Sequence, residues 1–175
     1  MTKETDDKQP WLAKPRAPRG DASPDPIFCG VGLALTMWET IEGELSIAYV
    51  GLIDSQGWRD NRYFSTHSFA GRHALVKEAI MANVNGRDCS GFGEFMDTVL
   101  KYSPRRHEIA HGRVFNLSEH GFYLGPNNSL ARNYPDGTAA YQYTSEDIKF
   151  YCDQFTHLAE IAKNFAERLA DRSRA

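Results

Sequence analysis

A long apolar stripe with helical spacing near the C-terminus restricts the architecture of this chain more than any other segment. Its members recur at steps of three and four residues, which places them on one face of a helix: Ile148, Tyr151, Phe155, Leu158, Ala162, Phe165 and Leu169. Thr144 or Ser145 is the expected cap, and Glu146 and Asp147 suit the first turn. The stripe predicts a helix that ends near Asp171 and buries one face against other helices.

Three more segments show apolar residues at helical spacing, and they predict helices at about 26–53, 66–84 and 90–102. Their buried faces are expected to include Trp38, Val76 and Leu100, whereas His73 is expected at the surface. Ser103 followed by Pro104 reads as a break and a new helix start, so a short helix is expected to reach about Leu117. Gly121 to Leu124 and Ala139 to Tyr143 are expected to pair as a short hairpin-like insertion, with Pro135-Asp136-Gly137 in its loop. The pattern predicts an all-α fold, an up-and-down bundle of four to five helices.

Composition restricts the domain boundaries, the binding surface and the cellular compartment. Residues 1–26 hold five prolines and almost no apolar side chains, so we expect a disordered tail before one domain at 27–172. The net charge of −3 argues against a broad nucleic-acid-coating surface but leaves room for a local basic site. The odd number of widely spaced cysteines fits a reducing compartment. No signal peptide and no apolar run of about 18 residues is visible, which predicts a cytoplasmic protein without membrane contact.

Cations, histidines and one carboxylate gather in residues 103–112, Ser-Pro-Arg-Arg-His-Glu-Ile-Ala-His-Gly. In a helix that begins at Pro104, His107 and His111 share a face. The N-terminus of a helix favours an anion, so Arg105 and Arg106 are expected to face a phosphate. Arg113 would add to this local basic site.

Two short patterns overlap in this segment. His107-Glu108-x-x-His111 matches the zinc-hydrolase pattern, in which two histidines hold zinc and the glutamate acts as a base. Two arginines beside a dication are unfavourable, and Pro104 stands where such a helix should already be established. Residues 106–111 also read Arg-x4-His, ending in Ile-Ala-His-Gly, and this resembles the R-x4–6-H motif of the HEPN family.

The resemblance implies a HEPN-like helical bundle and a metal-independent endoribonuclease without a cofactor. It implies that the 2′-hydroxyl of RNA attacks the phosphate to leave a 2′,3′-cyclic phosphate, with His111 moving a proton and Arg106 stabilising charge. His107, which stands where asparagine or aspartate is frequent, would orient the phosphate or share the proton transfer. Arg105 and Arg113 would contact the substrate.

The family also implies partners and a setting. Two motifs usually face each other across a symmetric homodimer, and relatives act as toxins or in defence against phage, with an antitoxin or regulatory protein as a further partner. Other relatives are binding or regulatory modules without activity.

Glu42 or Glu39, at or near the edge of the apolar stripe of the first helix, would orient Arg106 or a histidine, although a carboxylate at a core border more often pairs with a nearby cation.

Overall fold

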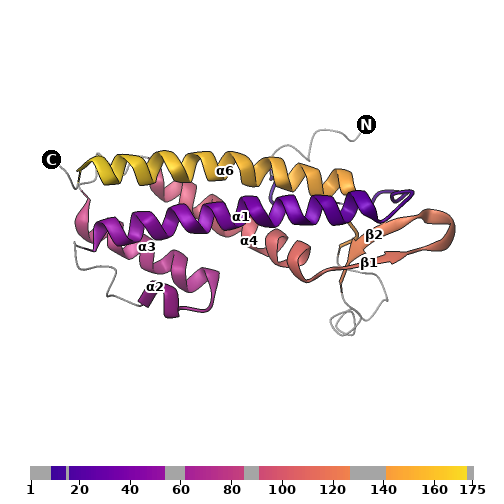
Figure 1. The fold of residues 1–175 in the computed structure, drawn as a ribbon, viewed down its shortest axis with the longest axis horizontal. Helices are drawn as coiled ribbons and strands as arrows, with labels where there is room; N and C mark the ends of the chain where they lie inside the picture. Colours follow the sequence, from indigo (N-terminus) through magenta and orange to yellow (C-terminus); the bar gives the residue numbers. More distant parts are fainter. Residues whose placement is uncertain (1–8, 15, 54–61, 85–90, 127–140, 173–175) are drawn as a thin grey trace. The chain divides into compact units, whose positions relative to one another are not determined.

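The computed structural model describes residues 9–14, 16–53, 62–84, 91–126 and 141–172. These residues are mostly helical and include one two-stranded antiparallel hairpin (Figure 1). The elements in chain order are α1 (Asp25–Leu52), α2 (Arg62–Ser65), α3 (Phe69–Asn83), α4 (Phe92–His111), β1 (Arg113–Asn116), the 3-10 turn η2 (Ser118–His120), β2 (Phe122–Gly125) and α6 (Ser145–Arg172). No helix in these ranges is long and apolar enough to cross a membrane.

The chain divides into two compact units, and α1, α4 and α6 contribute to both. One unit, called here the motif unit, comprises residues up to 35 together with 104–153. The other, called the helical unit, comprises residues 36–103 and those from 154 onward. Each unit has its own apolar core.

Aromatic side chains organise the core of the helical unit. The Trp38 ring meets Phe69 of α3 and Phe155 of α6 edge-on, with centroid distances of 5.0 and 5.1 Å. Phe92 of α4 meets Phe165 of α6 in the same way at 5.1 Å. The residues expected to form the buried faces of these helices are largely buried: Trp38, Ile41, Leu45, Ala48, Val76, Ala79, Ile80, Phe92, Phe95, Met96, Val99, Phe155, Leu158, Ala162 and Phe165. The helical periodicity is thereby confirmed.

Two residues of the helical unit differ from expectation. His73, expected at the surface, is 6% exposed, and its Nε2 lies 2.9 Å from the carbonyl oxygen of Met96. That hydrogen bond offsets the cost of burying an imidazole. Leu100, expected in the core, is 39% exposed because Phe95, Val99 and Tyr102 fill the buried face of α4.

The predicted break at Ser103-Pro104 is wrong, because α4 continues through Pro104 to His111. Proline lacks the N–H that would bond to the carbonyl of Leu100, four residues earlier. Leu100 and Pro104 are both exposed, so water can solvate that carbonyl and the helix is not forced to end. The motif therefore occupies the C-terminal turns of a long helix and not the start of a new one.

The helix ends at His111, and residues 113–116, expected to be helical, form strand β1. A Cβ on Gly112 would stand 2.8 Å from the carbonyl oxygen of Glu108 and 2.8 Å from Cγ of Leu124. Only glycine allows this close approach. It lets the chain turn directly from α4 into the hairpin (Figure 1).

The hairpin differs from the one expected. β1 pairs with β2 in a register that runs from Arg113 opposite Gly125 to Asn116 opposite Phe122. The expected pairing of Leu124 with the segment before α6 is also present, since Leu124 and Tyr143 exchange two main-chain hydrogen bonds of 2.8 Å. The expected loop at Pro135-Asp136-Gly137 lies outside the described residues.

Part of the segment expected to be a disordered tail makes ordered contacts in the motif unit. Asp21 exchanges main-chain hydrogen bonds of 3.0 and 2.9 Å with Phe122, and the N–H of Gly20 donates to His120 at 2.7 Å. The Asp21 carboxylate accepts from the N–H of Ser145 at 2.7 Å and from its hydroxyl. Main-chain pairing and helix capping hold these residues, which apolar content alone does not reveal.

Candidate functional site

The side chains of His107 and His111 form an exposed pair at the C-terminal end of α4. They lie one helical turn apart, and their ring centroids are 4.5 Å from each other. Arg106 is half-buried beside His107. Ile109, on the side of the helix opposite the two histidines, is buried and fixes the rotation of the helix. The sequence motif therefore presents two imidazoles to solvent next to a guanidinium group.

The surroundings of His107 favour its neutral form. Partial burial lowers the pKa of His107 below its usual value, and the charges of His111 and Arg106 lower it further. A neutral imidazole near pH 7 is able to accept a proton. Since the site lies at the carbonyl end of α4, the expected attraction of an anion to a helix N-terminus does not apply. An anion here would have to be held by Arg106 and Arg113.

Arg105 does not face solvent, where it was expected to contact a phosphate. Its Nη1 lies 3.0 Å from Oε2 of Glu108 and donates to the Tyr143 hydroxyl at 3.1 Å, and only 14% of the side chain is exposed. This places Arg105 within the protein, where it stabilises the last turns of α4. A phosphate contact through the same nitrogen would require that ion pair to open.

Glu108 is held by the same network. The Tyr143 hydroxyl donates to Oε2 of Glu108 at 2.5 Å, and the side chain of Glu108 is 18% exposed. Burial raises the pKa of Glu108, although Tyr143 and Arg105 oppose this shift. Burial and the adjacent Glu108 carboxylate raise the pKa of Tyr143, so its hydroxyl stays protonated as a donor. The Tyr141 hydroxyl adds a hydrogen bond of 3.1 Å to the carbonyl of Glu108.

Arg113 is exposed at the start of β1, immediately after Gly112. Its side chain is accessible to a ligand from solvent. Sequence order alone places it next to the histidine pair, because His111 ends α4 and β1 begins two residues later.

Glu42 and Glu39 lie in the helical unit, where Glu42 has its own partners. Its carboxylate accepts a hydrogen bond of 2.8 Å from Nε1 of Trp38 and pairs with Arg72. The hydroxyl of Tyr63 donates to its main-chain carbonyl at 3.0 Å. This agrees with the simpler alternative, a carboxylate at the core border that pairs with a cation. Glu39 is exposed.

No family model, curated protein or solved structure matches this chain.

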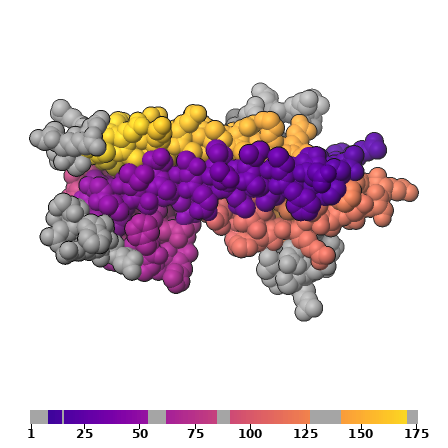
Figure 2. Space-filling model, viewed as in Figure 1, coloured from indigo at the N-terminus to yellow at the C-terminus, as the bar shows by residue number. Residues whose placement is uncertain are grey.

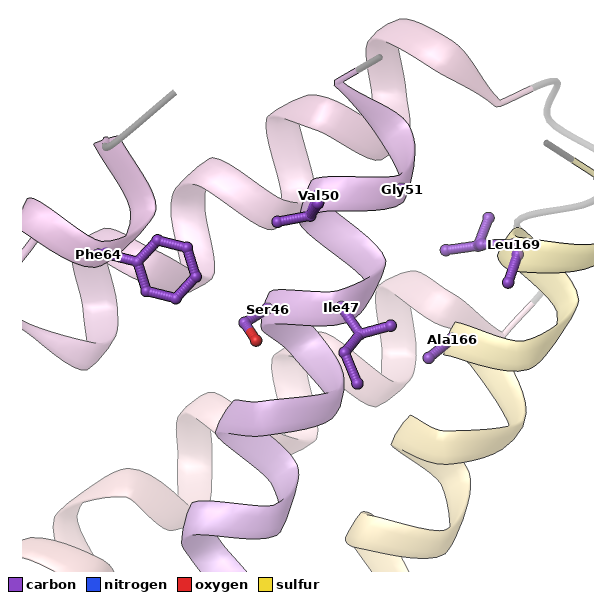
Figure 3. Close-up of a pocket in the computed structure, with 8 residues that line it drawn as sticks. Ser46, Ile47, Val50, Gly51, Phe64, Ala166 and Leu169 are labelled. Atoms are coloured by element: carbon purple, nitrogen blue, oxygen red, sulfur yellow. The ribbon is translucent and has the colours of Figure 1, made fainter. Parts of the chain in front are cut away.

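Two features of the structure were not anticipated from the sequence. The first is the Arg105–Glu108–Tyr143 network, which joins residues up to 38 positions apart. The second is an apolar groove of about 440 Å³ in the helical unit (Figure 3), lined by Ser46, Ile47, Val50, Gly51, Phe64, Ala166, Leu169 and Ala170. Among the described residues, the groove is lined by no ionisable side chain. The exposed apolar residues of α1, which lies at the surface in Figure 2, include Phe28, Leu33 and Ile47.

Metal ligands are sparse in the part of the chain that the structure describes. No group of three or more His, Cys, Asp or Glu side chains there is arranged to hold a metal ion. The zinc-hydrolase interpretation therefore has two ligands, His107 and His111, from these residues. Its proposed base, Glu108, is already bound to Arg105 and Tyr143.

Proposed function

We propose that this protein is a metal-independent endoribonuclease of the HEPN type, with an up-and-down helical bundle as its scaffold. The observation that supports this best is the exposed pair His107 and His111 beside Arg106, with the ring centroids 4.5 Å apart. Two adjacent imidazoles and one guanidinium group supply the acid, the base and the cation that cleavage of RNA requires. The Arg-x4-His spacing of the HEPN motif is the sequence counterpart of this arrangement.

The proposed reaction is attack of the 2′-hydroxyl on the adjacent phosphorus. One imidazole removes the 2′-hydroxyl proton as the new O–P bond forms, and the other protonates the 5′-oxygen as its bond to phosphorus breaks. His107 suits the base because its lowered pKa keeps it neutral, and His111 then serves as the acid. The products are a 2′,3′-cyclic phosphate and a 5′-hydroxyl.

Arg106 is assigned to the phosphate. Its planar guanidinium group matches two phosphate oxygens and opposes the negative charge that grows in the transition state. Arg113, which is exposed, is assigned to binding a neighbouring phosphate. Arg105 is assigned a positioning role, because Glu108 and Tyr143 hold its guanidinium group.

The proposal includes a symmetric homodimer with the motif at the interface and a setting in toxin–antitoxin or phage-defence systems, with an antitoxin or regulatory protein as a further partner. Each chain contributes only a few exposed motif residues, and a second copy facing the first would add another set of the same arginine and histidines. This favours the dimer. The alternative is a HEPN-like module that binds RNA through the same residues without cleaving it.

The test is cleavage of RNA by the purified protein in excess EDTA. His111→Ala should lower the rate by about 10²–10⁴-fold, since that is the usual contribution of a positioned acid or base. His67→Ala removes another exposed histidine and should leave the rate unchanged. Absence of cleavage by the unaltered protein would favour the binding module, and cleavage that EDTA abolishes would favour the zinc hydrolase.

A further inference from the structure

We propose that His107 and His111 also form a two-ligand site for a divalent transition-metal ion such as Zn²⁺ or Ni²⁺, and that occupancy of this site stops RNA cleavage. The inhibitory half of this proposal rests on the proposed function. The metal site itself rests only on the arrangement of the two side chains.

The geometry suits one shared ion. Residues four apart on a helix project in the same direction, and here both rings are exposed with centroids 4.5 Å apart. Zinc–imidazole bonds are about 2.0–2.1 Å long, so a single ion placed between the rings can reach a nitrogen of each after small rotations. Imidazole is also a preferred ligand of Zn²⁺ and Ni²⁺.

The end of α4 adds a favourable charge. His111 is the last residue of the helix, where the unpaired carbonyl groups form the negative pole of the helix dipole. That pole favours a cation within the last turn. Arg106 and the exposed Arg113 oppose this attraction with full positive charges, so the imidazole nitrogens must supply the binding energy.

The site differs from that of a zinc enzyme in two ways. The described residues provide only two ligands, so water must fill the remaining positions and the ion should dissociate readily. Glu108, the expected base, is held by Arg105 and by Tyr143. Among the described residues, Glu108 is therefore not available as a base to activate the water on a bound ion.

Occupancy of the site has a direct chemical consequence. A nitrogen lone pair that binds a metal ion cannot accept a proton, and the ligand must be in its deprotonated form. One ion would thus remove the acid and the base of the proposed reaction together. Metal should inhibit this protein, which is the opposite of what a zinc hydrolase shows.

The binding test is titration of the metal-free full-length protein with ZnCl₂ and, separately, NiCl₂ in a calorimeter. We expect one ion per chain to be lost, or bound at least tenfold more weakly, in both His107→Ala and His111→Ala. His67→Ala and His157→Ala, which remove exposed histidines elsewhere, should bind like the unaltered protein. Equal binding by all five proteins would refute the metal site, and far-ultraviolet circular dichroism would show that the variants remain folded.

The activity test adds ZnCl₂ to the RNA-cleavage reaction and then excess EDTA. We expect at least a tenfold loss of rate at saturating metal and full recovery after chelation. Stimulation by metal, or unchanged cleavage by a protein shown to hold the ion, would overturn the inhibition. If the metal-free protein does not cleave RNA, the proposed function and the inhibition both fail, while calorimetry still decides the metal site.

Discussion

Replacing Tyr143 by phenylalanine isolates the contribution of one buried hydroxyl to the end of α4. Tyr143 is fully buried, and its hydroxyl donates to the Glu108 carboxylate at 2.5 Å and accepts from Arg105 at 3.1 Å. A phenylalanine ring keeps the stacking on Tyr141 and the edge contact with Tyr151, with centroid distances of 5.1 and 5.4 Å. The substitution therefore removes the hydrogen bonds and leaves the ring packing in place.

The expected loss follows from the charge of the acceptor. A hydrogen bond to a charged group contributes about 1.5–3 kcal/mol, and a buried carboxylate that loses its donor stays desolvated. Because the Arg105–Glu108 ion pair remains, we expect Tyr143→Phe to lower the free energy of unfolding by about 2–3 kcal/mol. For a chain of this size that corresponds to a fall of roughly 5–10 °C in the unfolding temperature.

Tyr141→Phe is the matched control. The Tyr141 hydroxyl donates to a neutral group, the main-chain carbonyl of Glu108, at 3.1 Å. Such a bond contributes about 0.5–1.5 kcal/mol, so this variant should lose at least about 1 kcal/mol less than Tyr143→Phe. Urea unfolding with linear extrapolation measures both values. Equal losses of unfolding free energy in the two variants would show that the Tyr143 hydrogen bond to the Glu108 carboxylate contributes no more than a bond to a neutral carbonyl. That result would refute the stabilising role of the Arg105–Glu108–Tyr143 network.

Three further outcomes can be measured on the same segment. Gly112→Ala should lower the free energy of unfolding by about 1–3 kcal/mol, because its Cβ would meet Leu124 and a main-chain oxygen at 2.8 Å. Thermal unfolding measures this loss, and an unchanged unfolding temperature would contradict it. The raised pKa of Glu108 means that the folded state favours its protonated form, so this group's stabilising contribution is present below its usual pKa and is lost as the pH rises through the raised value. Urea unfolding at pH 4 and pH 7 should therefore show Glu108→Gln gaining stability relative to the unaltered protein as the pH rises, and a constant difference would argue against the shift. In a proton NMR titration the His107 ring should titrate below its usual pKa of 6.5. His111→Ala should raise this pKa only part of the way to 6.5, because burial is the larger cause of the shift. A measured pKa of His107 at or above 6.5 would contradict the lowered pKa.

The sequence predicted the long helices well because their signal is a repeated one. Trp38 and Phe155 each belong to a stripe several turns long, and one irregular residue does not change the period. His73 was within reach of the same argument, since it lies four residues after Phe69 and three before Val76, on the buried face of α3. Its polarity alone suggested the surface.

The break at Pro104 could not be judged from the sequence. A proline ends a helix when the carbonyl four residues earlier has no other way to be solvated, and that depends on whether Leu100 is exposed. The sequence placed Leu100 in the core, so the local rule and the tertiary environment gave different answers. Strand β1 was also missed, because the motif helix was expected to continue past Gly112 to about Leu117.

The motif residues were easy to bring together and hard to orient. Residues 105–111 are neighbours in the chain, so their proximity needed no fold. Which of them face solvent depends on the helix rotation set by Ile109 and on a partner far away in sequence, Tyr143. Arg105 and His107 were both expected to lie at the phosphate, but Arg105 is in the interior and His107 is exposed.

The contacts of Asp21 bear on where a shortened form of this protein can begin. A version that starts at residue 27, the apparent domain boundary, would lose the main-chain partner of Phe122 and the carboxylate at the start of α6. The freed edge of β2 would present unpaired N–H and C=O groups to other copies, which is a common origin of aggregation. Poor solubility of such a fragment would then reflect an uncovered strand edge and not a defect in the helices.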